Sequence, residues 1–80
     1  MKIDFNPYAI VYTDNTDIYD VSFIIIDEES KTIDVNDANG FSIAGIHYQE
    51  CEEIGYLPYT TDERLQGNTV VIIKNGELVI

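Results

Sequence analysis

The residue types that could do chemistry in this chain are one histidine, one cysteine and many carboxylates. His47 and Cys51 stand four positions apart, a spacing that places two side chains on one face of a helix. Zinc would need two more nitrogen or sulfur ligands, and the 80-residue chain has no second histidine or cysteine. A Cys–His nucleophilic pair would need an orienting group and an oxyanion site, and no motif marks either. We therefore expect Cys51 to be a small buried hydrophobic residue and His47 to lie at the surface.

Two acidic stretches have the composition of calcium-binding loops. Residues 14–17, continuing to Asp20, cluster the carboxylate and amide oxygens that Ca²⁺ prefers. Residues 34–40 begin like an EF-hand loop, but Ala38 stands at the third oxygen position and Gly45 replaces the bidentate glutamate. Asx residues before a glycine are also what a hairpin turn requires. We expect turns at both places and keep a calcium-binding module as an alternative.

Negative charge is the strongest feature of the composition. Fifteen acidic residues stand against four basic ones, which gives a net charge of −11. Fourteen of the acids lie between Ile3 and Glu63, where Lys31 is the only base. Such a protein repels nucleic acid and anionic membranes and attracts cationic surfaces. A hydrophobic content of 45%, with six tyrosines and three phenylalanines, indicates a folded chain rather than a disordered one.

Catalytic and cofactor motifs are missing from the sequence. No glycine-rich phosphate loop is present, no pair of carboxylates is singled out by its spacing, and four bases cannot form a basic patch. The sequence therefore favours a binding protein over an enzyme. We expect no catalytic residue, no cofactor and no metal ligand.

The acidic residues are clustered, and one cluster is accompanied by tyrosines. Large rigid rings with a polar tip, next to carboxylates, suit a surface that occupies an arginine- and lysine-rich cleft. We expect a partner-binding surface made of Asp27, Glu28, Glu29, Tyr48, Glu50, Glu52, Glu53, Tyr56 and Tyr59.

The elements that must position these residues are best defined at the C-terminus. Asn75-Gly76 between two β-branched runs predicts a hairpin with a type I′ turn, which requires positive φ at both loop residues. This register sets Lys74 opposite Glu77 and Ile73 opposite Leu78, with both faces of the hairpin apolar. We expect such a hairpin in the middle of a sandwich or barrel, or against a second subunit.

The rest of the chain reads as a meander of short strands. Alternating patterns predict strands at 8–13, 18–26, 31–35 and 41–43, with 18–26 central and Ala44-Gly45 as a bulge or bend. Residues 2–5 fit the start of a strand that Asn6-Pro7 either breaks or places at a sheet edge. Residues 46–55 fit either a helical stripe or an extended loop, and residues 56–59 an extended connector. A capping box from Thr60 to Glu63 predicts a short helix over 61–66.

Together these patterns predict one domain over residues 1–80 that is mainly β. We expect a small antiparallel barrel or sandwich of five to six strands with one short helical segment. The longest apolar run, residues 23–26, is far shorter than a membrane span, and no signal-peptide pattern is present. With a single cysteine, these features indicate a soluble cytoplasmic protein.

We therefore hypothesise a small acidic, non-enzymatic protein that binds a basic partner. The partner surface would be one that normally holds nucleic acid, so the chain would act as a nucleic-acid mimic. Short acidic chains without motifs are similar in type to inhibitors carried by phages or mobile elements. A structural module that assembles through the edges or faces of its β-strands, as in a virion, is the alternative. A large oligomer would favour this module, whereas a monomer or a homodimer would favour the inhibitor.

Overall fold

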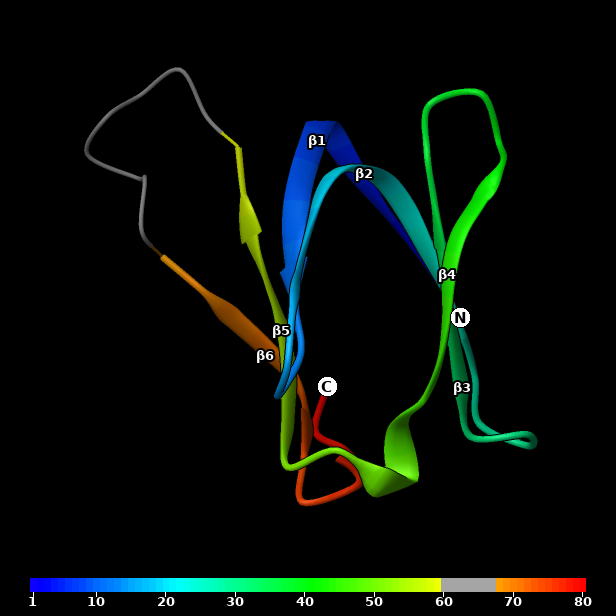
Figure 1. The fold of residues 1–80 in the computed structure, drawn as a ribbon, viewed down its shortest axis with the longest axis vertical. Coiled ribbons are helices and arrows are strands. Elements are labelled where there is room, and N and C mark those ends of the chain that lie inside the picture. Colours follow the sequence, from blue (N-terminus) through cyan, green and yellow to red (C-terminus); the bar gives the residue numbers. More distant parts are fainter. Residues whose placement is uncertain (60–67) are drawn as a thin grey trace.

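The computed structural model describes residues 1–59 and 68–80 and is mainly β. One antiparallel sheet contains seven strands in the order β4-β3-β2-β1-β5-β6-β7 (Figure 1). A single 3₁₀ turn, η1, spans Tyr48–Glu50. The strands are β1 Lys2–Tyr12, β2 Asp17–Asp27, β3 Thr32–Asn36, β4 Ser42–His47, β5 Glu53–Pro58, β6 Val70–Lys74 and β7 Glu77–Leu78. The predicted fold class is confirmed, with seven strands where five to six were expected.

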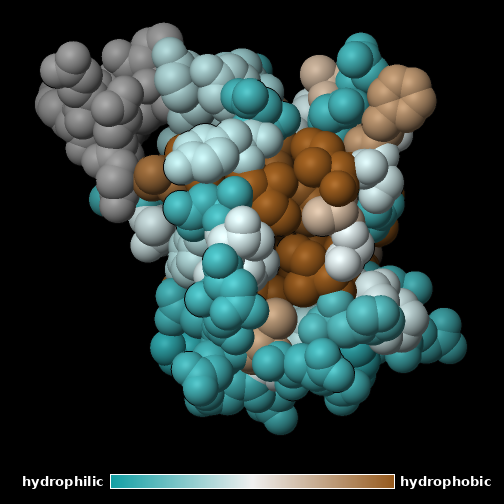
Figure 2. Space-filling view, viewed as in Figure 1, coloured by the Kyte–Doolittle hydropathy of each residue, from teal (hydrophilic) through white to brown (hydrophobic). Residues whose placement is uncertain are grey.

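The sheet folds over on itself into two facing layers (Figure 1). One layer contains β3 and β4, the other contains β5 and β6, and the long strands β1 and β2 arch from one layer to the other. The two end strands of the sheet, β4 and β7, do not pair with each other. Between the layers the apolar interior reaches the surface on the viewed side (Figure 2).

Both long strands bend where their pairing is interrupted. Asp4 pairs with Phe23 and the next pair is Ala9 with Val21, so residues 5–8 of β1 stand opposite a single residue of β2. Pro7, inside this stretch, has no N–H to donate to the ladder, which explains why the sequence pattern indicated a break here. The chain continues through the bend as one strand.

The bend also changes which face of β2 is buried. Strict alternation would place Val21 and Ile24 on opposite faces. Both side chains are fully buried instead, because the strand passes from one layer to the other between them. The predicted central position of this strand is confirmed, since β2 lies between β3 and β1.

The C-terminal hairpin has the predicted turn and register. Asn75 and Gly76 have φ values of 51° and 78°, and Ile73 pairs with Leu78 and Lys74 with Glu77. Its expected central position is wrong, because β7 is the last strand of the sheet. The loop is covered by the segment after η1, where the Asn75 N–H donates to the Glu52 carbonyl at 2.6 Å. This contact brings the β6–β7 turn next to residues 49–52.

The middle of the chain is more extended than the helical stripe suggested. Residues 46–55 contain the end of β4, the turn η1 and the start of β5. The connector predicted at 56–59 is mostly strand, and β5 pairs with both β1 and β6. The irregularity in β4 falls at Ile43 rather than at Ala44-Gly45, because Ala44 pairs with Val35 and Ser42 with Asn36. The capping box and helix predicted over 60–66 lie outside the described residues.

A cluster of fully buried side chains holds the two layers together. It consists mainly of β-branched aliphatic residues from both layers, with Tyr48 the largest: Val11, Val21, Ile24, Ile26, Ile33, Val35, Tyr48, Ile54, Ile72 and Ile73. His47 is exposed, as the sequence predicted. Cys51 packs against this cluster but is half-buried rather than buried as expected. The part of the chain that the structure describes contains no helix long and apolar enough to cross a membrane.

Candidate protein-binding surface

The three tyrosines predicted to accompany the Glu50–Glu53 cluster lie in three different environments. Tyr48 is 1% exposed and belongs to the core, so its ring is not available to a partner. Tyr56 is half-buried and its ring contacts that of Phe5, with centroids 4.7 Å apart. Tyr59 is 42% exposed and stacks on Tyr8. The aromatic side chains therefore do not form one surface with the acidic cluster.

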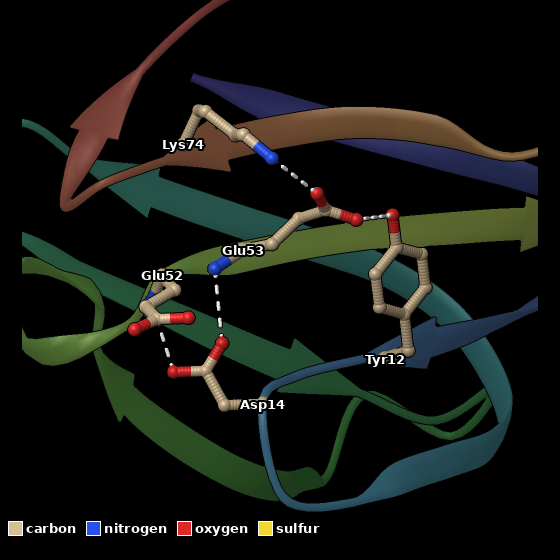
Figure 3. A network of polar contacts seen from close by, with 5 residues as sticks. All are labelled: Tyr12, Asp14, Glu52, Glu53 and Lys74. Atoms are coloured by element: carbon tan, nitrogen blue, oxygen red, sulfur yellow. Dashed lines mark hydrogen bonds and ion pairs between the residues drawn. The ribbon is translucent and has the colours of Figure 1, made fainter.

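The acidic segments themselves converge through a hydrogen-bonded network (Figure 3). Both carboxylate oxygens of Asp14, in the β1–β2 turn, accept backbone N–H groups at the start of β5, from Glu52 at 2.8 Å and Glu53 at 2.9 Å. These two hydrogen bonds favour the ionised carboxylate and lower the pKa of Asp14. Asp14 thus connects two segments that are far apart in the sequence.

Glu53 is the centre of the same network. Its Oε1 accepts a hydrogen bond from Lys74 Nζ at 2.8 Å, and its Oε2 accepts one from the Tyr12 hydroxyl at 2.8 Å (Figure 3). The bonds from Lys74 and then Tyr12 lower the pKa of Glu53, and the bond to Glu53 raises that of Lys74. Burial, followed by the bond to Glu53, raises the pKa of Tyr12. Glu53 is therefore neutralised by Lys74 and acts mainly within the protein.

A second junction brings the β2–β3 turn close to the C-terminal hairpin. Glu28, Lys31, Gln49 and Glu77 line one open hollow of about 350 Å³, although they come from three separate turns. Asp27, just before, accepts the backbone N–H groups of Ser30 and Glu29, and these bonds lower its pKa. The end of this turn is joined to η1, because the Tyr48 N–H donates to the Lys31 carbonyl at 3.1 Å.

These junctions define a surface that we name the acidic end. It contains the carboxylates of four segments, namely Asp14, Asp27, Glu28, Glu29, Glu50, Glu52, Glu53 and Glu77. The lower end of the molecule is hydrophilic over nearly the whole viewed face (Figure 2). Asp14 and Glu77 were not among the residues predicted from the sequence, because only the folded chain brings their turns next to Glu52 and Gln49.

Cys51 and His47 lie beside the acidic end without forming a reactive pair. The Cys51 thiol donates a hydrogen bond to the backbone oxygen of His47, with Sγ and O 3.9 Å apart. This contact does not involve the imidazole ring of His47. Burial, and then the charges of Asp14 and Glu50, raise the pKa of the Cys51 thiol. A raised pKa keeps the thiol protonated, whereas a nucleophile or a zinc ligand must be a thiolate.

The two calcium-like stretches are turns in which carboxylates bind backbone N–H groups. Asp14 is occupied by the two N–H groups of β5. The Oδ1 of Asp37 accepts the N–H groups of Asn39 and Phe41, each at 2.9 Å. Within residues 1–59 and 68–80, no group of three or more His, Cys, Asp or Glu side chains is placed to hold a metal ion.

A second surface feature was not predicted from the sequence. On the outer side of strands β2, β1 and β5, three tyrosines and two aliphatic side chains line a hollow of about 410 Å³. Two of these tyrosines, Tyr8 and Tyr19, stand in strand patterns where alternation alone does not distinguish an inward from an outward ring. We name this feature the tyrosine hollow.

Comparison of the chain with models of protein families, with curated proteins and with solved structures finds no match.

Proposed function

We propose that the protein binds a basic partner protein through its acidic end. The observation that carries the proposal is the gathering of eight carboxylates from separate segments at one end of the fold, against two lysines. One of these lysines, Lys74, is already paired with Glu53. The other, Lys31, lines the same hollow as Glu28 and Glu77.

This arrangement suits a partner whose cleft normally holds a nucleic-acid backbone. Such clefts are rich in arginine and lysine, and a rigid display of carboxylates complements them electrostatically. The segments of the acidic end are fixed in place by hydrogen bonds to backbone groups, which reduces the entropy lost on binding. We infer that the protein acts as a non-enzymatic inhibitor of the kind found in phages and mobile elements.

The test begins by recovering host proteins on the immobilised protein at about 50 mM salt, where exposed charges are little screened. A recovered partner is then bound to nucleic acid, and displacement of the nucleic acid by the free protein is measured. The proposal predicts displacement that weakens steeply as salt rises. Recovery of no nucleic-acid-binding protein, or binding that is insensitive to salt, would contradict it.

Two matched variants locate the interface. The double substitution Glu28→Gln with Glu50→Gln removes two carboxylates that make no hydrogen bond within the described part of the chain. The double substitution Asp4→Asn with Asp34→Asn removes the same charge from strands β1 and β3, where Asp4 pairs with Lys2 and Asp34 accepts a hydrogen bond from the Ser42 hydroxyl. We expect the first pair to weaken partner binding by about tenfold or more and the second pair to have less than half that effect on the binding free energy.

Assembly through a sheet edge is a second candidate function. Strand β4 has a neighbour on one side only within the described chain. Ile43 in this strand is 45% exposed, and Phe41 just before it is 70% exposed. An open edge with apolar side chains can pair with another chain. Light scattering distinguishes the two functions, because a large oligomer that is insensitive to salt favours assembly, and a monomer or dimer favours binding through the acidic end.

A further inference from the structure

The tyrosine hollow has the build of a site for one flat, positively charged group. Its floor is apolar, formed by Ile10 of β1 and Leu57 of β5, which pair directly across the sheet. Both side chains are half-buried on the outer side of the sheet, where a solvated layer would ordinarily carry polar residues. This apolar floor needs an explanation beyond the packing of the core.

Three aromatic rings surround the floor, one from β1, one from β2 and one from the residue that follows β5. Tyr8 and Tyr59 stack with centroids 4.7 Å apart and an interplanar angle of 26°. The third, Tyr19, is 61% exposed, more than any other tyrosine of the described residues. The faces of tyrosine rings carry partial negative charge, so cations lie favourably over them.

Asp20 supplies a full negative charge at the same hollow. It lies in the bulge of β2, where its φ of 58° is unusual for any residue other than glycine. Its side chain is exposed and forms no ion pair with any of the described lysines. A carboxylate beside aromatic faces is the combination that binds a guanidinium, which stacks on a ring and donates hydrogen bonds in its own plane.

We propose that the tyrosine hollow binds an arginine side chain of the basic partner. This inference rests on the proposed function for the class of partner, and adds the residue that is recognised. The net charge of −11 favours a cationic occupant over a second copy of the chain. A second copy would also need about 800 Å² of surface on each partner, which a hollow for one side chain does not provide.

The experiment uses short blocked peptides, so that it does not depend on the identity of the partner. Gly-Gly-Arg-Gly-Gly is titrated into the protein, and the ring resonances of Tyr8, Tyr19 and Tyr59 are followed by NMR. The same peptide with citrulline in place of arginine has nearly the same shape but no charge. The peptide with lysine has the positive charge but lacks the planar guanidinium group. We expect citrulline to bind about tenfold more weakly and lysine about threefold more weakly than arginine.

Variants of two exposed residues assign the binding to the hollow. Tyr19→Ala and Asp20→Asn should each weaken arginine binding by about threefold to tenfold, whereas Tyr19→Phe, which keeps the ring, should retain it. Asparagine also tolerates positive φ, so Asp20→Asn removes the charge without disturbing the bulge. Equal binding of the arginine and citrulline peptides, or unchanged binding by Tyr19→Ala, would overturn the assignment.

The failure of this inference can be told apart from the failure of the proposed function. Glu28→Gln with Glu50→Gln should leave the arginine peptide's effect on the three tyrosine rings unchanged, because these residues lie at the acidic end. If that pair weakens partner binding while the arginine peptide does not perturb the hollow, the acidic end is supported and the arginine site is wrong. If the peptide binds the hollow and no basic partner is recovered, the arginine site stands alone.

Discussion

At the scale of single residues, Gly55 is a position where no side chain fits. A Cβ built on Gly55 would lie 2.5 Å from the Tyr12 hydroxyl and 2.6 Å from the backbone oxygen of Val70. The second of these atoms belongs to the backbone of β6 and cannot move away without breaking the sheet. The ring of Tyr12, which reaches across to Glu53, therefore requires glycine at this place in β5.

Substitution of this glycine should destabilise the protein. We expect Gly55→Ala to lower the free energy of unfolding by about 1–3 kcal/mol through overpacking, as measured by urea denaturation. Gly45→Ala in β4 is the matched control, because a Cβ there has nothing within 4 Å. Equal effects of the two substitutions would contradict the close approach of β1, β5 and β6.

The Asp14 carboxylate should make stability depend on pH. Its ordinary pKa of 3.8 is lowered in the folded chain by the N–H groups of Glu52 and Glu53. Its contribution is therefore present above the unfolded pKa and is lost as pH falls through the folded pKa. We expect Asp14→Asn to be less stable than the natural protein at pH 7, and the difference to shrink towards about pH 3.

Urea midpoints of both proteins at the two pH values check this prediction. Acid also relieves the repulsion among the other carboxylates, so only the difference between the proteins is informative. A difference that stays constant between the two pH values would show that the Asp14 bonds do not need the charge.

At the scale of elements, the bulge of β2 holds Asp20 with a positive φ. The positive φ of Asp20 suits glycine better than any residue with a Cβ. We expect Asp20→Gly to leave stability unchanged or raise it by up to about 1 kcal/mol, measured by thermal unfolding. Asp17→Gly, an exposed control in the same strand, should instead lower stability by about 0.5–1 kcal/mol. A loss of stability in Asp20→Gly as large as that in the control would contradict backbone strain at Asp20.

The elements also show how far local patterns determine this fold. The Asn75-Gly76 hairpin and the strand around Val21 are predicted correctly, because turn chemistry and β-branched runs act over a few residues. Strand β5 was not predicted, since Gly55 and Pro58 depress its β propensity and only its pairing with β1 and β6 stabilises it.

The candidate surfaces were predictable only in part, for a related reason. Clustered carboxylates such as Glu50 and Glu52 can be read from the sequence. Burial of Tyr48 could not be read, because it depends on η1 packing beneath the C-terminal hairpin. The tyrosine hollow joins residues about 50 positions apart, a juxtaposition that no local pattern contains.

At the scale of the whole molecule, a folded chain with a net charge of −11 repels itself. Salt screens that repulsion and so stabilises the fold, but it also weakens attractive ion pairs. The described residues form only two such pairs, Lys2–Asp4 at 3.4 Å and Lys74–Glu53 at 2.8 Å. We expect the melting temperature to rise as sodium chloride is raised from about 10 mM to about 300 mM. Most of the increase should come below about 100 mM, the concentration at which the Debye length has fallen to about 10 Å. A melting temperature that falls over this range would show that attractive pairs outweigh the repulsion.

The same charge distribution should control how fast a partner is bound. Electrostatic steering acts mainly on association, so the acidic end should determine the association rate constant and its salt dependence. The charges of this end are concentrated in turns that hydrogen bonds hold close together. Removing two of these charges should therefore lower the association rate constant more than removing two charges elsewhere.

The most direct measurement is the association rate constant with a recovered basic partner, compared between Glu28→Gln with Glu50→Gln and Asp4→Asn with Asp34→Asn. We expect the first pair to slow association several-fold at about 50 mM salt, the second pair to slow it less, and the difference to disappear at about 500 mM. Equal slowing by the two pairs would contradict it, because the partner would then respond to the net charge of the protein and not to the acidic end.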